Sequence, residues 1–211
     1  AVLRLHIPLP IFWALYFQMF SLWYLQTKEM DLQITSNFKV AAEQVTALNP
    51  LFDVTLLAFF SAIFAIYRKC CSAQVSPKVK IAIGYFFAIG AFVLAAILQK
   101  RINNAKAEYG TDAHGKPNHR LSVLEQAPQF VLICAGEVLV YPAALHLVYI
   151  HSPVSMRSFV QSVLWFFIGI GNLFNMMTVA ATENTVKTTT GVYIGYTVAM
   201  CLAWLAYILL A

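Results

Sequence analysis

The stretch Phe130–Tyr149, FVLICAGEVLVYPAALHLVY, is a continuous apolar run that contains a single acid, Glu137. Gln126 and Pro128 precede the run and Pro153 follows it, which predicts a helix of roughly 24 residues, long enough to cross a bilayer. An ionised side chain at the centre of such a helix costs at least about 2.5–3.5 kcal/mol on insertion scales. We therefore expect Glu137 to face a water-filled cavity or a cationic partner.

The rest of the chain has the composition of a polytopic membrane protein. Of its 211 residues, 60% are hydrophobic and 11% are charged, with a mean hydropathy of +0.70. This composition leaves too little polar surface to cover a water-soluble domain. The apolar runs are continuous rather than alternating, which is typical of helices and not of barrel strands. We predict an all-α membrane protein in which residues 1–211 form one transmembrane bundle of six helices. The predicted spans are residues 7–26, 50–67, 81–99, 126–150, 159–181 and 192–210.

The basic residues predict an orientation. Arg68, Lys69, Lys78 and Lys80 crowd the short connection between the second and third spans, which contains no acid, whereas the longer connections mix both signs. The positive-inside rule places this connection in the cytosol. The net charge of +5 then reflects topology, and no aromatic and basic pattern indicates a nucleic-acid partner. Arg4 directly precedes a run too long for a cleavable signal, so we expect no signal peptide and a chain that is a piece of something longer.

Few side chains indicate catalytic or metal chemistry. Cys134 and Cys201 lie inside predicted spans as small packing residues, while Cys70 and Cys71 are either a palmitoylation site or a bland pair at the membrane edge. The sequence contains no metal-ligand spacing, Gly-rich phosphate loop or Ser/His/Asp constellation. Asp53, near the start of the second span, is interpreted as a helix cap. The sequence therefore predicts no metal site and no enzymatic activity.

Helical spacing groups several candidate residues. Tyr141 lies four residues after Glu137, so a phenol and a carboxylate would share one face. Trp13 begins an aromatic face that is either a packing surface or the wall of a substrate site. That face continues with Tyr16 or Phe17, Phe20 and Tyr24. Gly169 and Gly171 indicate a tight seam between helices.

Several short motifs occur in a fixed order along the chain. They are Ile7-Pro8-Leu9-Pro10-Ile11-Phe12-Trp13 with Gln18 and Trp23; Leu48-Asn49-Pro50-Leu51; Ser76-Pro77; Gln126-Ala127-Pro128, Gly136-Glu137-Val138-Leu139, Pro142, Tyr149, Pro153 and Ser155-Met156-Arg157-Ser158; then Trp165 and Gly171-Asn172. In this order and spacing they resemble the second half of the proton-dependent oligopeptide transporter (POT/PTR) family. The first group resembles its seventh helix, the next two resemble the starts of its eighth and ninth helices, and the remaining motifs resemble its tenth helix and the segment that follows it. The resemblance runs from about residue 4 to the end of the chain.

The resemblance implies that the chain is the C-terminal six-helix half of a twelve-helix major-facilitator fold. Its partners would be the lipid bilayer, the N-terminal six-helix half of the same transporter and a peptide bound near the midplane between the halves. The implied activity is proton-coupled symport of di- and tripeptides, with the proton as the coupling ion and no other cofactor. We expect such a transporter in the plasma membrane.

The resemblance also implies roles for individual residues. Glu137 would pair with the peptide amino terminus and take part in proton-linked gating. Trp13 and Trp165 would line the pocket, Asn49 would contact the peptide backbone, and Tyr141 would join them from the face of Glu137. Desolvation penalises the charged form of a carboxyl group, so Glu137 could exchange a substrate ammonium for a proton.

The chain departs from the family pattern at several positions. Tyr141 stands where the family often has serine, His146 where many members have an acid, and Phe17 and Ser61 where animal members place acids. These departures leave the substrate open. The alternatives are a transporter of another small solute, such as nitrate or histidine, and a non-transporting membrane sensor or scaffold. An intramembrane enzyme is disfavoured because Glu137 has no second carboxylate or nucleophile at a suitable spacing.

Overall fold

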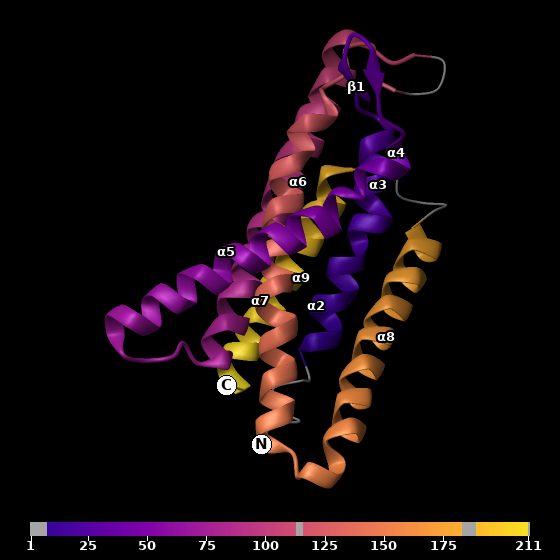
Figure 1. Ribbon diagram of the computed structural model, residues 1–211. Coiled ribbons are helices and arrows are strands. Elements are labelled where there is room, and N and C mark those ends of the chain that lie inside the picture. The colour runs from indigo at the N-terminus through magenta and orange to yellow at the C-terminus, as the bar shows by residue number, and fades with distance from the viewer. Residues whose placement is uncertain (1–7, 113–115, 183–188, 211) are drawn as a thin grey trace.

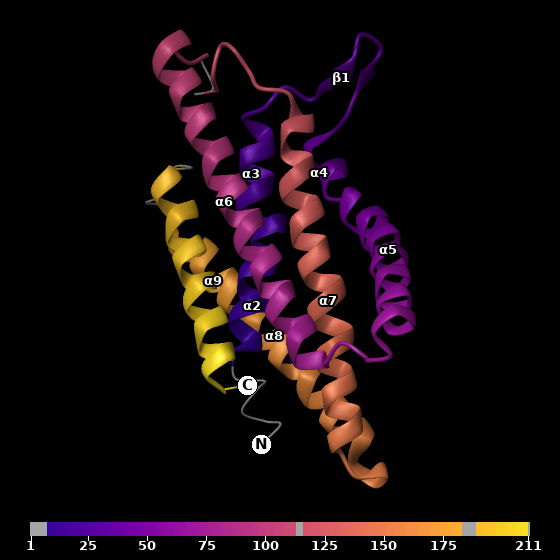
Figure 2. The ribbon, with the colours of Figure 1, turned by 90° about the vertical axis from the view of Figure 1, so that its left-hand side faces the viewer.

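The computed structural model describes residues 8–112, 116–182 and 189–210, which form an elongated bundle of helices (Figure 1 and Figure 2). Five helices of this part of the chain are long and apolar enough to span a membrane, so the predicted all-α membrane class is confirmed. In chain order the elements are α2 (Leu9–Tyr16), the 3-10 helix η1 (Phe17–Phe20), α3 (Leu22–Lys28), β1 (Gln33–Thr35), β2 (Phe38–Lys39), α4 (Ala42–Val45), α5 (Leu48–Cys71), α6 (Pro77–Tyr109), η2 (Val123–Gln126), α7 (Ala127–His151), η3 (Val154–Met156), α8 (Arg157–Thr182) and α9 (Thr190–Leu210).

The first predicted span, residues 7–26, is interrupted in the structure. Its first residue lies outside the described residues, and the remainder is divided into α2, η1 and α3. The Ser21 hydroxyl donates a hydrogen bond to Oε1 of Gln18 at 2.9 Å, and Nδ2 of Asn175 on α8 donates to the carbonyl oxygen of Phe17 at 3.2 Å. Side chains thus replace backbone partners at the break, which makes the break tolerable inside hydrocarbon. Two helices joined by a 3-10 turn take the place of one continuous helix.

The third predicted span, residues 81–99, is the core of a much longer helix. α6 continues to Tyr109, and Nζ of Lys106 in its added turns lies 2.7 Å from Oε1 of Glu29. The antiparallel hairpin of β1 and β2 lies at the same end of the bundle (Figure 1). The two longer connections between predicted spans therefore contain regular structure, stabilised partly by a partly buried ion pair between them.

The backbones of α6 and α7 approach each other closely, and the two helices run side by side (Figure 2). A Cβ atom added to Gly84 would lie 2.8 Å from the carbonyl oxygen of Gly136, and one added to Gly136 would lie 2.9 Å from the carbonyl oxygen of Gly84. Only glycine permits this approach, as at other small-residue seams in membranes. Glu137 directly follows Gly136 on α7, so the seam fixes the position of Glu137 relative to α6.

Buried glutamines join α3, α6 and α7. Nε2 of Gln26 donates to Oε1 of Gln99 at 3.0 Å, and Nε2 of Gln129 donates to Oε1 of Gln26 at 3.1 Å. Nε2 of Gln126 donates to the carbonyl oxygen of Trp23 at 3.0 Å. All four amides are buried. Because hydrocarbon supplies no hydrogen-bond partners, this cluster holds the three helices in one register.

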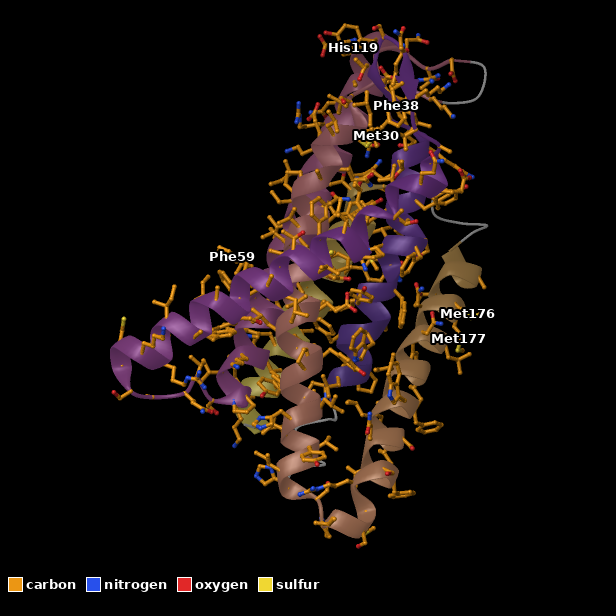
Figure 3. All side chains as sticks on the ribbon, viewed as in Figure 1. Met30, Phe38, Phe59, His119, Met176 and Met177 are labelled. Atoms are coloured by element: carbon orange, nitrogen blue, oxygen red, sulfur yellow. The ribbon has the colours of Figure 1, made fainter. Side chains whose placement is uncertain are left out.

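The outer faces of α5 and α8 are apolar and uncovered by the rest of the described chain. Phe59 projects from α5, and Met176 and Met177 project from α8 (Figure 3). Each of these side chains is more than half exposed. Such faces are suited to lipid or to another part of a membrane protein.

The two glycines of the predicted seam on α8 differ. A Cβ atom added to Gly171 would lie 2.6 Å from the carbonyl oxygen of Pro10 on α2, whereas nothing lies within 4 Å of one added to Gly169. The seam prediction therefore holds for Gly171 and is wrong for Gly169.

Candidate functional site

Glu137 lies in the middle of α7 and is partly buried. The hydroxyl of Tyr16, at the end of α2, donates a hydrogen bond to its Oε2. α2 ends at Tyr16 because the chain turns into η1 there, so this phenol is held at a helix end facing α7. An ionised carboxylate has room for about four hydrogen-bond donors, so Glu137 keeps most of its capacity for a ligand.

Asn49, in the first turn of α5, connects Tyr16 to the rest of the site. Its Nδ2 donates to the Tyr16 hydroxyl at 3.0 Å and to Oδ2 of Asp53 at 3.1 Å. Its Oδ1 accepts a hydrogen bond from the thiol of Cys134 at 2.8 Å. Asn49 is only 7% exposed, so these bonds form with little competition from water. One polar network therefore joins α2, α5 and α7 around Glu137.

Asp53 is part of this network and does not cap a helix. α5 begins at Leu48 and has no acid in its first turn, so the predicted capping role is wrong. Asp53 lies one turn further along, where Oδ2 accepts from Asn49 and Oδ1 is buried without a hydrogen-bond partner. The spacing of four residues places Asn49 and Asp53 on the same face of α5.

Asp53 and Glu137 line one cavity of about 200 Å3 between α5 and α7. The remaining lining residues are Val54, Leu57, Val138, Tyr141 and Pro142. The lining contains no lysine, arginine or histidine, and the three ion pairs between described residues lie elsewhere. Carboxylates at membrane depth are normally neutralised by a proton or by a cation. The arrangement can hold a proton, an ammonium group or both in turn.

Aromatic rings form a row beside the carboxylates. The Tyr141 ring on α7 lies between the Trp13 ring on α2, with centroids 6.1 Å apart, and the Trp165 ring on α8, with centroids 5.6 Å apart. Trp13 is buried and its Nε1 has no hydrogen-bond partner, whereas Trp165 is 55% exposed. This row forms an apolar wall, which is a feature of small-ligand sites.

The structure gathers the predicted site residues to different degrees. Glu137 and Tyr141 line the carboxylate cavity, and Asn49 joins it through Asp53 and Tyr16. Trp13 and Trp165 contact Tyr141 but do not line the cavity.

Sequence reasoning missed two members of the site, Tyr16 and Asp53. Helical spacing places either Tyr16 or Phe17 on the aromatic face and does not distinguish between them. The spacing of four residues between Asn49 and Asp53 indicates a shared helix face, but Asp53 was interpreted as a helix cap instead.

Comparisons with known proteins agree with the motifs. A family model described as the POT family matches residues 1–205. The peptide transporter PTR2 of Saccharomyces cerevisiae is 26% identical over 211 residues, which cover 98% of this chain and 34% of the yeast protein. Human solute carrier family 15 member 2 is 38% identical over 104 residues, covering 48% of this chain and 14% of the human protein. The chain thus spans about a third or less of the length of these relatives.

A solved structure extends the comparison to the fold. The crystal structure of an auto-inhibited POT family peptide transporter superposes with a TM-score of 0.80 and 23% identity, over 99% of this chain and 40% of that one. This similarity supports the predicted major-facilitator arrangement of helices. Because the family model matches nearly the whole chain, the resemblance is confirmed, and this integral, multi-pass membrane protein belongs to the POT family.

Proposed function

We propose that the transporter containing this chain carries di- and tripeptides across the membrane by symport with protons. One observation carries the proposal: two carboxylates, Asp53 and Glu137, line a single cavity whose lining contains no cation. A peptide supplies the missing cation as its amino-terminal ammonium. The yeast and human relatives named above, a peptide transporter and a solute carrier, support this assignment.

In this proposal Glu137 binds the substrate ammonium and takes part in proton coupling. Oε2 of Glu137 accepts from Tyr16, which leaves Oε1 and further lone pairs for the ligand. A proton on Glu137 removes the charge that holds the ammonium. The proton and the ammonium then compete for Glu137, so a proton that reaches Glu137 promotes release of the peptide, and the co-transported proton is carried on another group of the full-length transporter.

The neighbouring residues shape the peptide site. Trp13 and Trp165 form its walls with Tyr141 between them, and Asn49 contacts the peptide backbone. The exposed apolar faces of α5 and α8 are covered in part by an N-terminal six-helix half, and the peptide lies between the two halves. We place the transporter in the plasma membrane, and we assign it no enzymatic activity and no cofactor other than the coupling proton.

The test is uptake of a labelled dipeptide by the full-length protein in liposomes, with and without an inward proton gradient. We expect accumulation that requires the gradient and that unlabelled dipeptides block. Absence of uptake by correctly folded protein would contradict the proposal. Inhibition by nitrate or histidine, with no inhibition by dipeptides, would show that the substrate is a different small solute.

Replacement of Tyr16 by Phe should weaken dipeptide binding by roughly 10-fold or more, because a charge-assisted hydrogen bond typically contributes about 1.5–3 kcal/mol. The change removes the donor to Glu137 and the acceptor of Asn49 without altering the ring. The measurement is KM for proton-driven uptake.

The matched control is Tyr24→Phe, which removes another phenol–carboxylate bond, 2.7 Å to Oε1 of the distant and exposed Glu43. Uptake by the Tyr24→Phe variant should stay at the wild-type level. An equal loss in both variants would contradict a specific role of Tyr16 in positioning Glu137.

A further inference from the structure

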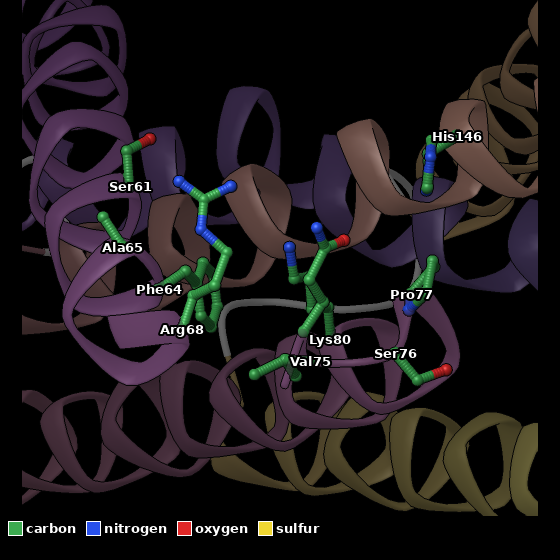
Figure 4. Close-up of a pocket in the computed structure, with 10 residues that line it drawn as sticks. Ser61, Phe64, Ala65, Arg68, Val75, Ser76, Pro77, Lys80 and His146 are labelled. Atoms are coloured by element: carbon green, nitrogen blue, oxygen red, sulfur yellow. The ribbon is translucent and has the colours of Figure 1, made fainter. Parts of the chain in front are cut away.

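A second cavity, of about 500 Å3, lies among the end of α5, the start of α6 and the later turns of α7 (Figure 4). Its lining includes Arg68 from α5, Lys80 from α6 and His146 from α7, and contains no acid. Lys80 lies between Arg68 and His146 in the view of Figure 4. Ser61 and Ser76 add hydroxyl groups. Donors from three helices therefore converge on one space, which is the arrangement that an anion requires.

The cations of this cavity have no carboxylate partner in the described part of the chain. The ion pairs there involve Arg101, Lys106 and Arg120. Nζ of Lys80 instead lies 4.3 Å from the centroid of the Phe64 ring. The guanidinium of Arg68 and the ammonium of Lys80 are thus available to an external anion. Arginine is the side chain best suited to bind phosphate through two parallel hydrogen bonds.

An apolar groove continues from the basic cavity. A space of about 170 Å3 between α5 and α7 shares Ser61, Phe64, Pro77, Lys80 and His146 with the basic cavity. Its other walls are apolar: Leu57, Phe60, Val138, Leu139, Pro142 and Ala143. From Arg68 to Leu57, the axis of α5 extends over about 16 Å. The combined space is therefore basic at its mouth and apolar within.

We propose that this combined space binds an anionic phospholipid of the cytosolic leaflet. The headgroup phosphate binds to Arg68, Lys80 and His146, and one acyl chain lies in the groove between α5 and α7. The connection at the mouth is the one that the positive-inside rule assigns to the cytosol, and anionic lipids are concentrated in that leaflet. A soluble phosphate compound would leave the apolar groove unfilled. The bound chain would hold α5 against α7 beside the carboxylate cavity, with which the groove shares Leu57, Val138 and Pro142.

The test measures lipid retention by the purified full-length transporter and needs no transport, so its outcome is independent of the proposed substrate. Delipidated protein is titrated with dioleoyl phosphatidylserine or dioleoyl phosphatidylcholine, and bound lipid is counted by native mass spectrometry. We expect one phosphatidylserine to bind more tightly than phosphatidylcholine. The double variant Arg68→Gln/Lys80→Gln should lose this preference, with retention weakened roughly 30-fold.

The matched control is Lys69→Gln/Lys78→Gln, which removes the same charge from the same connection but outside the lining of the cavity. It should keep the phosphatidylserine preference, and size-exclusion chromatography should show both variants folded. Equal loss in both variants would overturn the site, because it would indicate general surface attraction. Full competition by soluble glycerophosphoserine would also overturn the lipid assignment, since the acyl chain would then contribute nothing.

Discussion

Glu137→Gln in the full-length transporter is expected to reduce proton-driven dipeptide uptake by at least about 100-fold while surface expression stays unchanged. Glutamine has nearly the same shape and can still accept the hydrogen bond from Tyr16. It cannot carry the charge that holds an ammonium at membrane depth. Loss of one partner of a buried charge pair typically costs about 3–5 kcal/mol, which corresponds to a factor of 100 or more.

Asp53→Asn serves as the companion variant. It removes the second charge of the cavity but keeps an oxygen that can accept from Asn49. We expect a smaller loss than for Glu137→Gln, because only Glu137 is assigned to the ammonium. Wild-type uptake by fully expressed Glu137→Gln protein would remove Glu137 from the site.

Gly171→Ala should destabilise the folded protein. The new Cβ would lie 2.6 Å from the carbonyl oxygen of Pro10, 2.8 Å from Cβ of Trp13 and 2.9 Å from the backbone nitrogen of Ala14. None of these atoms is the flexible end of a side chain, so α2 and α8 must separate. Overpacking of this kind costs about 1–3 kcal/mol, and we expect a clearly lower Tm together with reduced uptake, because Trp13 would be displaced.

Gly169→Ala is the matched control for the α2–α8 seam. Nothing lies within 4 Å of a Cβ at this position, and alanine is favoured over glycine in a helix by about 1 kcal/mol. The Tm of Gly169→Ala should therefore be unchanged or slightly higher. If both variants lowered Tm equally, the close contact of α8 with α2 would be wrong.

The long apolar runs predicted the class of the fold, and the order of the motifs predicted the family. Both predictions depend only on local composition and on the spacing of residues along the chain. The break between α2 and α3 could not be predicted in this way. It depends on Asn175, which is 158 positions from Phe17 and reaches its carbonyl oxygen only in the folded bundle. Long-range hydrogen bonds of this kind leave no local periodicity.

The site was predictable only where local composition and spacing indicate it. Glu137 was visible as an isolated acid in an apolar run, and Tyr141 as its neighbour on one helix face. Tyr16 and Phe17 could not be separated because α2 ends between them, so helical spacing stops being a guide there. Asp53 was misinterpreted because the predicted start of the helix, at residue 50, placed it in the first turn. The observed start at Leu48, two residues earlier, places it in the second turn.

We propose that Glu137 binds the amino-terminal ammonium of a peptide. The most direct test compares the Kd of a dipeptide with that of its N-acetylated form, for purified full-length wild-type protein and for Glu137→Gln. We expect acetylation to weaken binding to the wild type by roughly 10- to 100-fold, the range for a charge-assisted contact, and to have little effect on the variant. Equal affinity of the wild type for both ligands would contradict the account.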